Sequence, residues 1–195
     1  MIKAVIFDCF GVLYLDTSRH FYENHIPDYE KLWPELMELN KQSDYGLISQ
    51  DELVDGVVEL TGADRNFVAE NIRGVHKRND SLLDFAISLR DKYKVGMLSN
   101  IGPGAMDTFF SPEDRKMLFD ATLLSGDVGV VKPNPAIFQM IAEKLGVDTG
   151  ECVMIDDIED NCAGADASGM RAIQFINNAQ VKRDLDKLLK ETKSA

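Results

Sequence analysis

Short apolar runs that end on polar residues alternate with longer amphipathic stretches along most of this chain. The runs have the composition of strands buried on both faces of a sheet, and the stretches have the apolar spacing of helices. The expected strands cover residues 2–7, 94–98, 121–124, 152–155 and 171–175. Strands that alternate with helices are typical of a parallel sheet. We therefore predict an α/β fold with a doubly wound parallel sheet.

Residues 14–79 differ from the rest, because their helical pattern is not interrupted by a strand-like run. Ser49 and Glu52 have the spacing of a capping box, which predicts the start of a helix. Pro27 and Pro34 are expected to separate short helices, since proline removes a backbone donor and crowds the preceding turn. The segment thus reads as a small all-helical insertion after the first strand.

These patterns predict two domains: an α/β core formed by residues 1–13 and 80–195, and a helical domain formed by residues 14–79. The apolar residues of the second helical stretch are expected to form the core of the insertion, and not a cofactor pocket. They are Leu32, Trp33, Leu36, Met37 and Leu39.

Composition and charge narrow the function classes. Of 195 residues, 45% are hydrophobic and 28% are charged, which is ordinary for a water-soluble globular protein. The net charge is −12 and no basic stripe is present, so we expect no nucleic-acid partner. No apolar run is long enough to cross a membrane, and no signal peptide is recognised, so we expect a cytoplasmic protein without a membrane partner.

The cysteines agree with that compartment. Cys9, Cys152 and Cys162 are odd in number and lack metal-ligand spacing, so we expect buried, reduced thiols. The sequence leaves the oligomeric state open between a monomer and a homodimer.

Polar side chains stand where the expected strands end. Asp8 follows the first strand, Ser99 the second, and Asp156 and Asp157 close the fourth; Lys132 lies eight residues beyond the third. The carboxyl ends of parallel strands lie at one edge of a sheet, where open α/β sheets bind ligands. These residues are therefore expected to form a single site.

The residue types at this edge suit phosphoryl chemistry. Three carboxylates brought together repel one another unless a cation compensates, and Lys132 neutralises one charge. A divalent ion bound by oxygen ligands is the natural partner for the rest, and Mg²⁺ suits a sparse set of carboxylates completed by water and phosphate. Ser99 and Lys132 supply a hydroxyl donor and a positive charge for a phosphoryl oxygen. An Asp beside such a metal can act as the nucleophile through an aspartyl-phosphate.

In these motifs the sequence resembles the haloacid dehalogenase-like (HAD) superfamily over nearly its whole length. The residues that carry the resemblance are Asp8-Cys9-Phe10-Gly11-Val12-Leu13, Leu98-Ser99-Asn100, Val130-Val131-Lys132-Pro133-Asn134-Pro135 and Ile155-Asp156-Asp157-Ile158-Glu159-Asp160-Asn161. The helical insertion corresponds to the cap of the family, which covers the site and selects the substrate.

The resemblance implies a role for each matched residue. Asp8 corresponds to the nucleophile, which is also a metal ligand, and Lys132 to the lysine that contacts both nucleophile and phosphate. Ser99, with Asn100 beside it, corresponds to the phosphate-binding motif. Asp157 matches the direct Mg²⁺ ligand, and Asp156 matches the auxiliary acid.

Phe10 departs from the pattern of the family's phosphatases, which have an Asp two residues after the nucleophile. That Asp protonates the leaving oxygen and later activates water, and losing such a group is expected to cost about 10²- to 10⁴-fold in rate. The resemblance implies that the main-chain carbonyl of Phe10 still contributes to Mg²⁺ binding. With Phe10 in place, the leaving group must depart largely unaided or be protonated by a cap residue, the substrate or water. We therefore expect turnover to depend steeply on leaving-group pKa, with aryl and acyl phosphates far better than alkyl esters.

Three functions follow, of which the first is our prediction: a Mg²⁺-dependent phosphatase of a small phosphorylated metabolite. The second is a metal-independent 2-haloacid dehalogenase, because the family's dehalogenases also carry an aromatic residue at the position of Phe10. Their fourth motif is rich in Ser and Asn, however, whereas this chain has Asp156 and Asp157. The third is a non-catalytic scaffold that binds a phosphorylated ligand or a protein partner. The substrate is not disclosed, because specificity would lie within residues 14–79.

Overall fold

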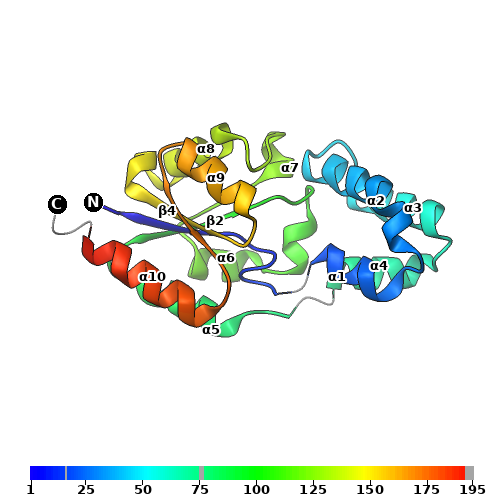
Figure 1. Ribbon diagram of the computed structural model, residues 1–195, viewed down its shortest axis with the longest axis horizontal. Helices are drawn as coiled ribbons and strands as arrows, with labels where there is room; N and C mark the ends of the chain where they lie inside the picture. Colours follow the sequence, from blue (N-terminus) through cyan, green and yellow to red (C-terminus); the bar gives the residue numbers. More distant parts are fainter. Residues whose placement is uncertain (16, 75–76, 192–195) are drawn as a thin grey trace.

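A computed structural model of the chain describes residues 1–15, 17–74 and 77–191, and places five parallel strands in one sheet (Figure 1). The strands lie in the order β3-β2-β1-β4-β5. They are β1 (Ala4–Phe7), β2 (Lys94–Ser99), β3 (Ala121–Leu124), β4 (Cys152–Asp156) and β5 (Arg171–Gln174). Because the chain runs outward from β1 in one direction and then in the other, the sheet is doubly wound, and the predicted fold class is confirmed.

Alternation along β1 explains the two layers of helices in the core. Val5 and Phe7 face a hydrophobic cluster that includes residues of α5, α6 and α10, whereas Ala4 and Ile6 face a second cluster with α8 and α9. All four side chains are fully buried, as expected for a central parallel strand. The helices are α5 (Asp80–Leu89), η1 (Ala105–Thr108), α6 (Pro112–Leu118), α7 (Ser125–Val128), α8 (Pro135–Leu145), η2 (Thr149–Glu151), α9 (Glu159–Ala167) and α10 (Asn178–Glu191).

The segment between β1 and α5 forms a separate helical body, hereafter the cap, at the opposite end of the molecule from the N-terminus (Figure 1). Its helices are α1 (Ser18–His25), α2 (Tyr29–Asp44), α3 (Gln50–Thr61) and α4 (Arg65–Gly74). They share a hydrophobic core that includes Tyr22, Leu36 and Val54. The capping box expected at Ser49 is present, since its hydroxyl accepts from the N–H of Glu52.

The expectation that Pro34 ends a helix is wrong. Pro34 lies inside α2, five residues after the helix begins, while Pro27 does fall in the break between α1 and α2. A proline within a helix costs about 3 kcal/mol, chiefly through a lost backbone hydrogen bond. Burial of the fully enclosed Leu36 and its partly buried neighbours Trp33 and Met37 against the cap core offsets this cost, so packing overrides local propensity.

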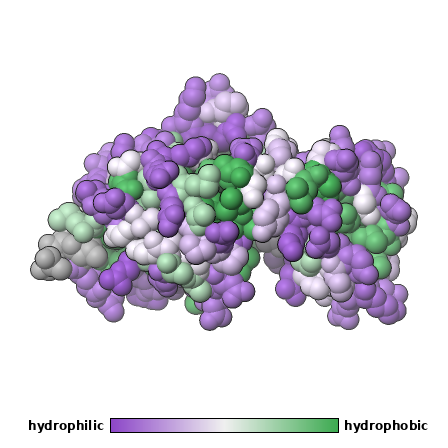
Figure 2. Space-filling model, turned by 90° about the horizontal axis from the view of Figure 1, so that it is seen from above, coloured by the Kyte–Doolittle hydropathy of each residue, from purple (hydrophilic) through white to green (hydrophobic). Residues whose placement is uncertain are grey.

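Two polar connections fix the cap over the sheet edge. The linkers run side by side, and the main chains of Tyr14 and Arg78 form an antiparallel bridge. Farther out, the Ser125 hydroxyl on α7 donates to the carbonyl oxygen of Asp44 at 2.5 Å and accepts from the N–H of Ile101 at 3.0 Å. The space-filling view shows a notch between the large and small bodies (Figure 2).

Cys9, Cys152 and Cys162 are buried free cysteines, as expected. Within the parts of the chain that are described, no helix combines the length and apolar character needed to cross a membrane.

Candidate active site

Asp8 leaves β1 at the centre of the sheet edge. Its N–H donates to the carbonyl oxygen of Ile155 at 2.8 Å, so pairing with β4 continues one residue past the strand and fixes its backbone. The residue as a whole is 5% exposed. Its Oδ1 accepts from the N–H of Cys9 at 2.6 Å and lies 2.8 Å from Lys132 Nζ. Since both contacts engage Oδ1, Oδ2 is the oxygen of Asp8 that remains for a ligand.

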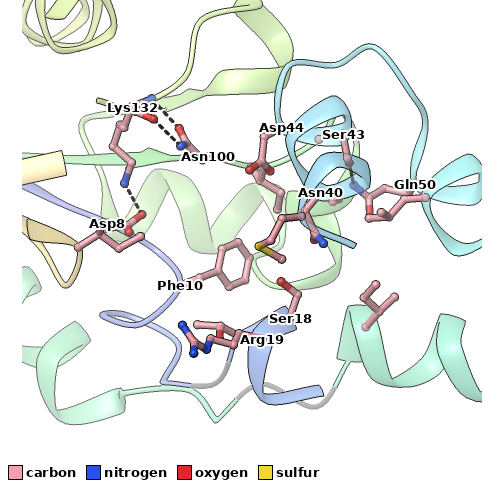
Figure 3. A pocket seen from close by; sticks show the side chains of 18 of the residues that line it. Asp8, Phe10, Ser18, Arg19, Asn40, Ser43, Asp44, Gln50, Asn100 and Lys132 are labelled. Carbon is pink, nitrogen blue, oxygen red and sulfur yellow. Dashed lines mark hydrogen bonds and ion pairs between the residues drawn. The ribbon is translucent and has the colours of Figure 1, made fainter. Parts of the chain in front are cut away.

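Lys132 reaches the same point from the segment after α7. Its Nζ donates to Asp156 Oδ2 at 2.6 Å and to the carbonyl oxygen of Leu98 at 3.2 Å. Asn100 fixes its backbone: the Asn100 Nδ2 donates to the Lys132 carbonyl at 3.0 Å, and the Lys132 N–H donates to Asn100 Oδ1 at 2.9 Å (Figure 3). Asn100 therefore positions Lys132, and both of its polar side-chain atoms already have partners.

Asp156 and Asp157 close β4 but have different surroundings. Asp156 is fully buried, and its Oδ1 accepts from the N–H of Ile158 and from Asn161 Nδ2, each at 3.0 Å, while Lys132 occupies Oδ2. Asp157, in contrast, has a buried Oδ1 without a hydrogen-bond partner among the described residues. Asp156 thus organises the site, whereas Asp157 presents an oxygen to it.

Gly11 makes room for Asp157. The turn after β1 gives Gly11 a φ of +85°, which residues with a side chain rarely adopt. A Cβ at this position would lie 2.3 Å from Asp157 Oδ2. The first motif therefore needs glycine for two reasons, the left-handed turn and the close approach of the carboxylate.

Ser99 ends β2 with its side chain fully buried. Its Oγ has no hydrogen-bond partner within the described part of the chain, although a buried hydroxyl normally has one. The unpaired Ser99 hydroxyl is therefore available to donate a hydrogen bond to an oxygen of a ligand.

The electrostatics of the cluster show an excess of negative charge. Burial raises the pKa of Asp8 well above its usual range, and Asp156 adds to the rise while Lys132 opposes it. Burial and Asp156 also raise the pKa of Asp157. Burial alone would lower the pKa of Lys132, but Asp156 and Asp8 outweigh it and the net change is a rise. The amine stays charged, and one amine does not balance three acids.

The three acids could hold a cation. Asp8, Asp156 and Asp157 each offer a carboxylate oxygen, and these oxygens lie within 4.8 Å of one another. Carboxylate oxygens are the ligands that hard divalent ions prefer. A bound cation would give Asp157 Oδ1 a partner, and it would stabilise the charged form of Asp8, whose pKa is raised without it.

A cavity of about 470 Å³ lies between this edge and the cap. Asp8, Lys132 and Asp157 line the core side, and Phe10 lines it with Phe109, whose ring centroid is 4.9 Å away. The cap contributes Ser18, Arg19, Trp33, Met37, Asn40, Ser43, Asp44 and Gln50. The sequence predicted that Trp33 and Met37 belong only to the core of the cap. In the structure they pack against that core and also line the cavity.

Sequence reasoning missed the polar residues on the cap side of this cavity, Asp44 above all. Asp44 is the last residue of α2, and its carboxylate faces the space in front of Asp8 (Figure 3). No motif or spacing marks it. The only available signal was an acid at the end of an amphipathic helix, where helix dipoles favour bases instead.

A doubly wound sheet with acids, an amine and a hydroxyl at one edge, beneath helices inserted after β1, defines the class of capped α/β hydrolases. The sequence matches the haloacid dehalogenase-like hydrolase family over residues 2–169, and the chain belongs to that family. The resemblance seen in the four motifs is confirmed.

Phosphatases are among the relatives of this chain. It is 28% identical to the D-ribitol-5-phosphate phosphatase of Bacteroides thetaiotaomicron, and the match covers 97% of this chain and 99% of that protein. It is 43% identical to the phosphatase MT3486 of Mycobacterium tuberculosis over 36% of this chain. Three curated relatives, the mycobacterial protein among them, are matched over only 28% to 62% of their own lengths.

A solved structure shares both domains. A HAD family enzyme of Bacteroides thetaiotaomicron, in complex with magnesium and inorganic phosphate, superposes with a TM-score of 0.74 at 28% identity. The superposition covers 89% of this chain and 94% of that chain.

Proposed function

We propose that this hydrolase is a Mg²⁺-dependent phosphatase of a small phosphorylated metabolite that uses Asp8 as its nucleophile. The observation that carries the proposal is the pairing of two features at one sheet edge. Asp8 keeps Oδ2 uncommitted beside the Lys132 amine, and Asp157 places an unpaired buried oxygen next to it. The D-ribitol-5-phosphate phosphatase and the relative solved with magnesium and phosphate support the choice of reaction.

The donor set fits Mg²⁺. Asp8 and Asp157 would bind the ion directly, with the main-chain carbonyl of Phe10 and water completing the shell. Asp156 acts in support, because Lys132, Ile158 and Asn161 already occupy its oxygens. When bound, the ion neutralises charge between the attacking carboxylate and the phosphate, which otherwise repel each other.

The side chains of the core edge account for phosphoryl transfer. Asp8 Oδ2 forms a bond to phosphorus as the bond from phosphorus to the leaving oxygen breaks, giving an aspartyl-phosphate. Lys132 and Ser99 donate to the phosphoryl oxygens, where charge develops in the transition state. Water then attacks phosphorus, the bond to Asp8 breaks, and inorganic phosphate leaves with the carboxylate restored.

Phosphate release from a panel of phosphorylated metabolites, with and without Mg²⁺, tests this proposal. Asp8→Asn should lower turnover more than about 10³-fold, because a nucleophile cannot be replaced by its neighbours. Asp91→Asn, which removes an exposed acid of the core, is the matched control and should keep wild-type turnover. Hydrolysis that persists without Mg²⁺ or in Asp8→Asn would overturn the proposal.

Calorimetric titration with Mg²⁺ provides a second readout that does not depend on turnover. Asp157→Asn should weaken Mg²⁺ binding at least about tenfold, since it removes the carboxylate whose buried Oδ1 has no hydrogen-bond partner among the described residues.

Two alternatives, both motivated by Phe10, are separated by the measurements above together with an assay for chloride release. Mg²⁺ binding with no turnover of any phosphate ester would indicate a non-catalytic scaffold. Release of chloride from 2-chloropropionate in the presence of EDTA would indicate a dehalogenase.

A further inference from the structure

Among the described residues, and apart from the proposed nucleophile and metal ligands, the core side of the site lacks a group that can donate a proton to the leaving oxygen. Phe10 occupies the position two residues after the nucleophile, and its ring packs edge-on against Phe109 at the cavity wall. Lys132 is held by Asp8 and Asp156 and stays charged, so it is a poor proton donor. A side chain that donates this proton would therefore lie on the opposite wall of the cavity.

Asp44 is placed on that wall by contacts with the core. It ends α2, and its carbonyl oxygen accepts from the Ser125 hydroxyl, which is itself tied to Ile101. Close by, Gly46 approaches Gly126 so tightly that a Cβ on Gly46 would lie 2.5 Å from the Gly126 oxygen. Asp44 is therefore a cap residue fixed at the joint between the two bodies.

The Asp44 carboxyl is partly buried and lines the cavity together with Asp8 (Figure 3). Within the residues described, no hydrogen bond or ion pair engages this carboxyl, unlike the fully engaged Asp156. A carboxyl group with no structural partner that faces a reactive site is available to a ligand.

Burial raises the pKa of Asp44 to about 7, and the charge of Lys132 moderates the rise. The other charged groups that line the cavity are Asp8 and Asp157 on the core and Arg19 on α1. Tyr22, on α1, also senses the Asp44 charge, and Asp127 on the adjoining α7 is exposed. Near neutral pH the carboxyl can both give up and accept a proton, as a general acid–base requires.

We propose that Asp44, a residue of the cap, donates the proton to the leaving oxygen that the missing acid at position 10 would otherwise supply. The inference rests on the proposed phosphatase function. As Asp8 Oδ2 bonds to phosphorus and the ester bond breaks, the Asp44 proton passes to the departing oxygen and the product alcohol forms. Asp44, now a carboxylate, accepts a proton from the water that attacks the aspartyl-phosphate, so phosphate leaves and both acids return to their starting states.

The proposal changes the leaving-group dependence expected from Phe10 alone. With an internal proton donor, wild-type kcat/KM should depend only weakly on leaving-group pKa. Asp44→Asn should restore the steep dependence, lowering kcat/KM for alkyl phosphates by about 10²-fold or more while changing that for p-nitrophenyl phosphate by less than about threefold. Asp127→Asn removes an acid on the adjoining helix and should leave both values unchanged.

The pH profile supplies a readout that a structural role would not move. Wild-type kcat/KM for an alkyl phosphate should fall as the pH rises through about 7, because the donor is then ionised, and this limb should be absent in Asp44→Asn. Adding Phe10→Asp to Asp44→Asn should restore alkyl-ester turnover at least about tenfold.

Three results would overturn the inference: a steep wild-type dependence of kcat/KM on leaving-group pKa, an equal loss for aryl and alkyl esters in Asp44→Asn, or a variant that retains the pH limb. The wild-type slope decides the matter even if the variant folds poorly. Each of these leaves Mg²⁺- and Asp8-dependent hydrolysis intact, whereas the proposed function itself fails if hydrolysis is absent or if it persists without Mg²⁺ or in Asp8→Asn.

Discussion

The two walls of the cavity differ in how their chemistry is encoded. On the core wall, Asp8, Ser99 and Asp157 stand directly at strand ends, so the topology of a parallel sheet brings them together from distant parts of the chain. On the cap wall, Asp44 and Asn40 lie on a helix whose position over the core depends on contacts between two bodies. The residues of the core wall can therefore be predicted from the sequence, whereas those of the cap wall are recognised only in the three-dimensional structure.

The walls also differ in how completely their polar groups are paired. Lys132 and Asp156 form a buried network in which each atom has a partner, which fixes the geometry of the nucleophile. The Asp44 carboxyl has no such partner among the described residues, so its ionisation depends on burial and on what occupies the cavity. In a site divided in this way, paired contacts hold the reacting groups in place, while the protonation of Asp44 can change with what occupies the cavity.

The largest expected effect is on the core wall, at Lys132. Lys132→Met would leave Asp8 and Asp156 buried without their counter-charge and should lower the free energy of unfolding by about 3–5 kcal/mol, measured by urea denaturation near pH 7. Because burial raises the pKa of Asp8 well above its usual range, this carboxyl can take up a proton, and the loss should shrink as the pH is lowered. Lys144→Met, which removes an exposed amine from the same domain, should change stability by less than about 0.5 kcal/mol. A similar, pH-independent loss in both variants would contradict the network.

Gly11→Ala should affect metal binding more than stability. The new Cβ would displace Asp157, so Mg²⁺ affinity should fall about tenfold or more, with about 1–2 kcal/mol lost from the strained turn. Gly146→Ala is the matched control, since Gly146 has a φ of +70° but a Cβ added there would meet no atom within 4 Å. It should show the strain with no change in Mg²⁺ titration. Equal Mg²⁺ affinities in the two variants would show that Asp157 does not depend on Gly11.

The extent to which the sequence predicts this molecule follows the same division. The sheet follows from the apolar runs because each residue of β1 is buried and alternates between two layers of helices. The site at its edge follows because strand order fixes where Asp8 and Asp157 end up. Neither conclusion needs the detailed packing of side chains.

The rest depends on packing between distant segments, which local pattern does not contain. Pro34 was expected to end a helix, but contacts of α2 with the cap core hold the helix together across it. Asn100 matched a phosphate-binding motif, and the structure adds that its amide hydrogen-bonds the backbone of Lys132, which no motif indicates. Asp44 enters the cavity only because Ser125 fixes the end of α2, a contact between residues 81 positions apart.

The smallest predicted effect tests whether the Asp44 carboxyl carries its charge at a cost in stability. Its pKa is about 7 in the folded protein against an ordinary 3.8, so the folded state binds the proton more tightly, and stability falls as the pH rises from about 4 through 7. Asp44→Asn removes the ionisable group and should be more stable than the wild type above pH 7, with no difference near pH 4. The difference between 3.8 and about 7 corresponds to about 4 kcal/mol, but because the side chain is partly exposed we expect about 1–2 kcal/mol.

Thermal unfolding across this pH range measures the effect, at about 2–4 °C in Tm for each kcal/mol. The exposed Asp127 provides the comparison, because Asp127→Asn should follow the wild-type curve at every pH. Parallel curves for Asp44→Asn and the wild type would mean that the carboxyl is already well solvated or paired in solution. The cap wall would then be no more responsive than the core wall, and Asp44 would lose the property that suits it to exchange protons near neutral pH.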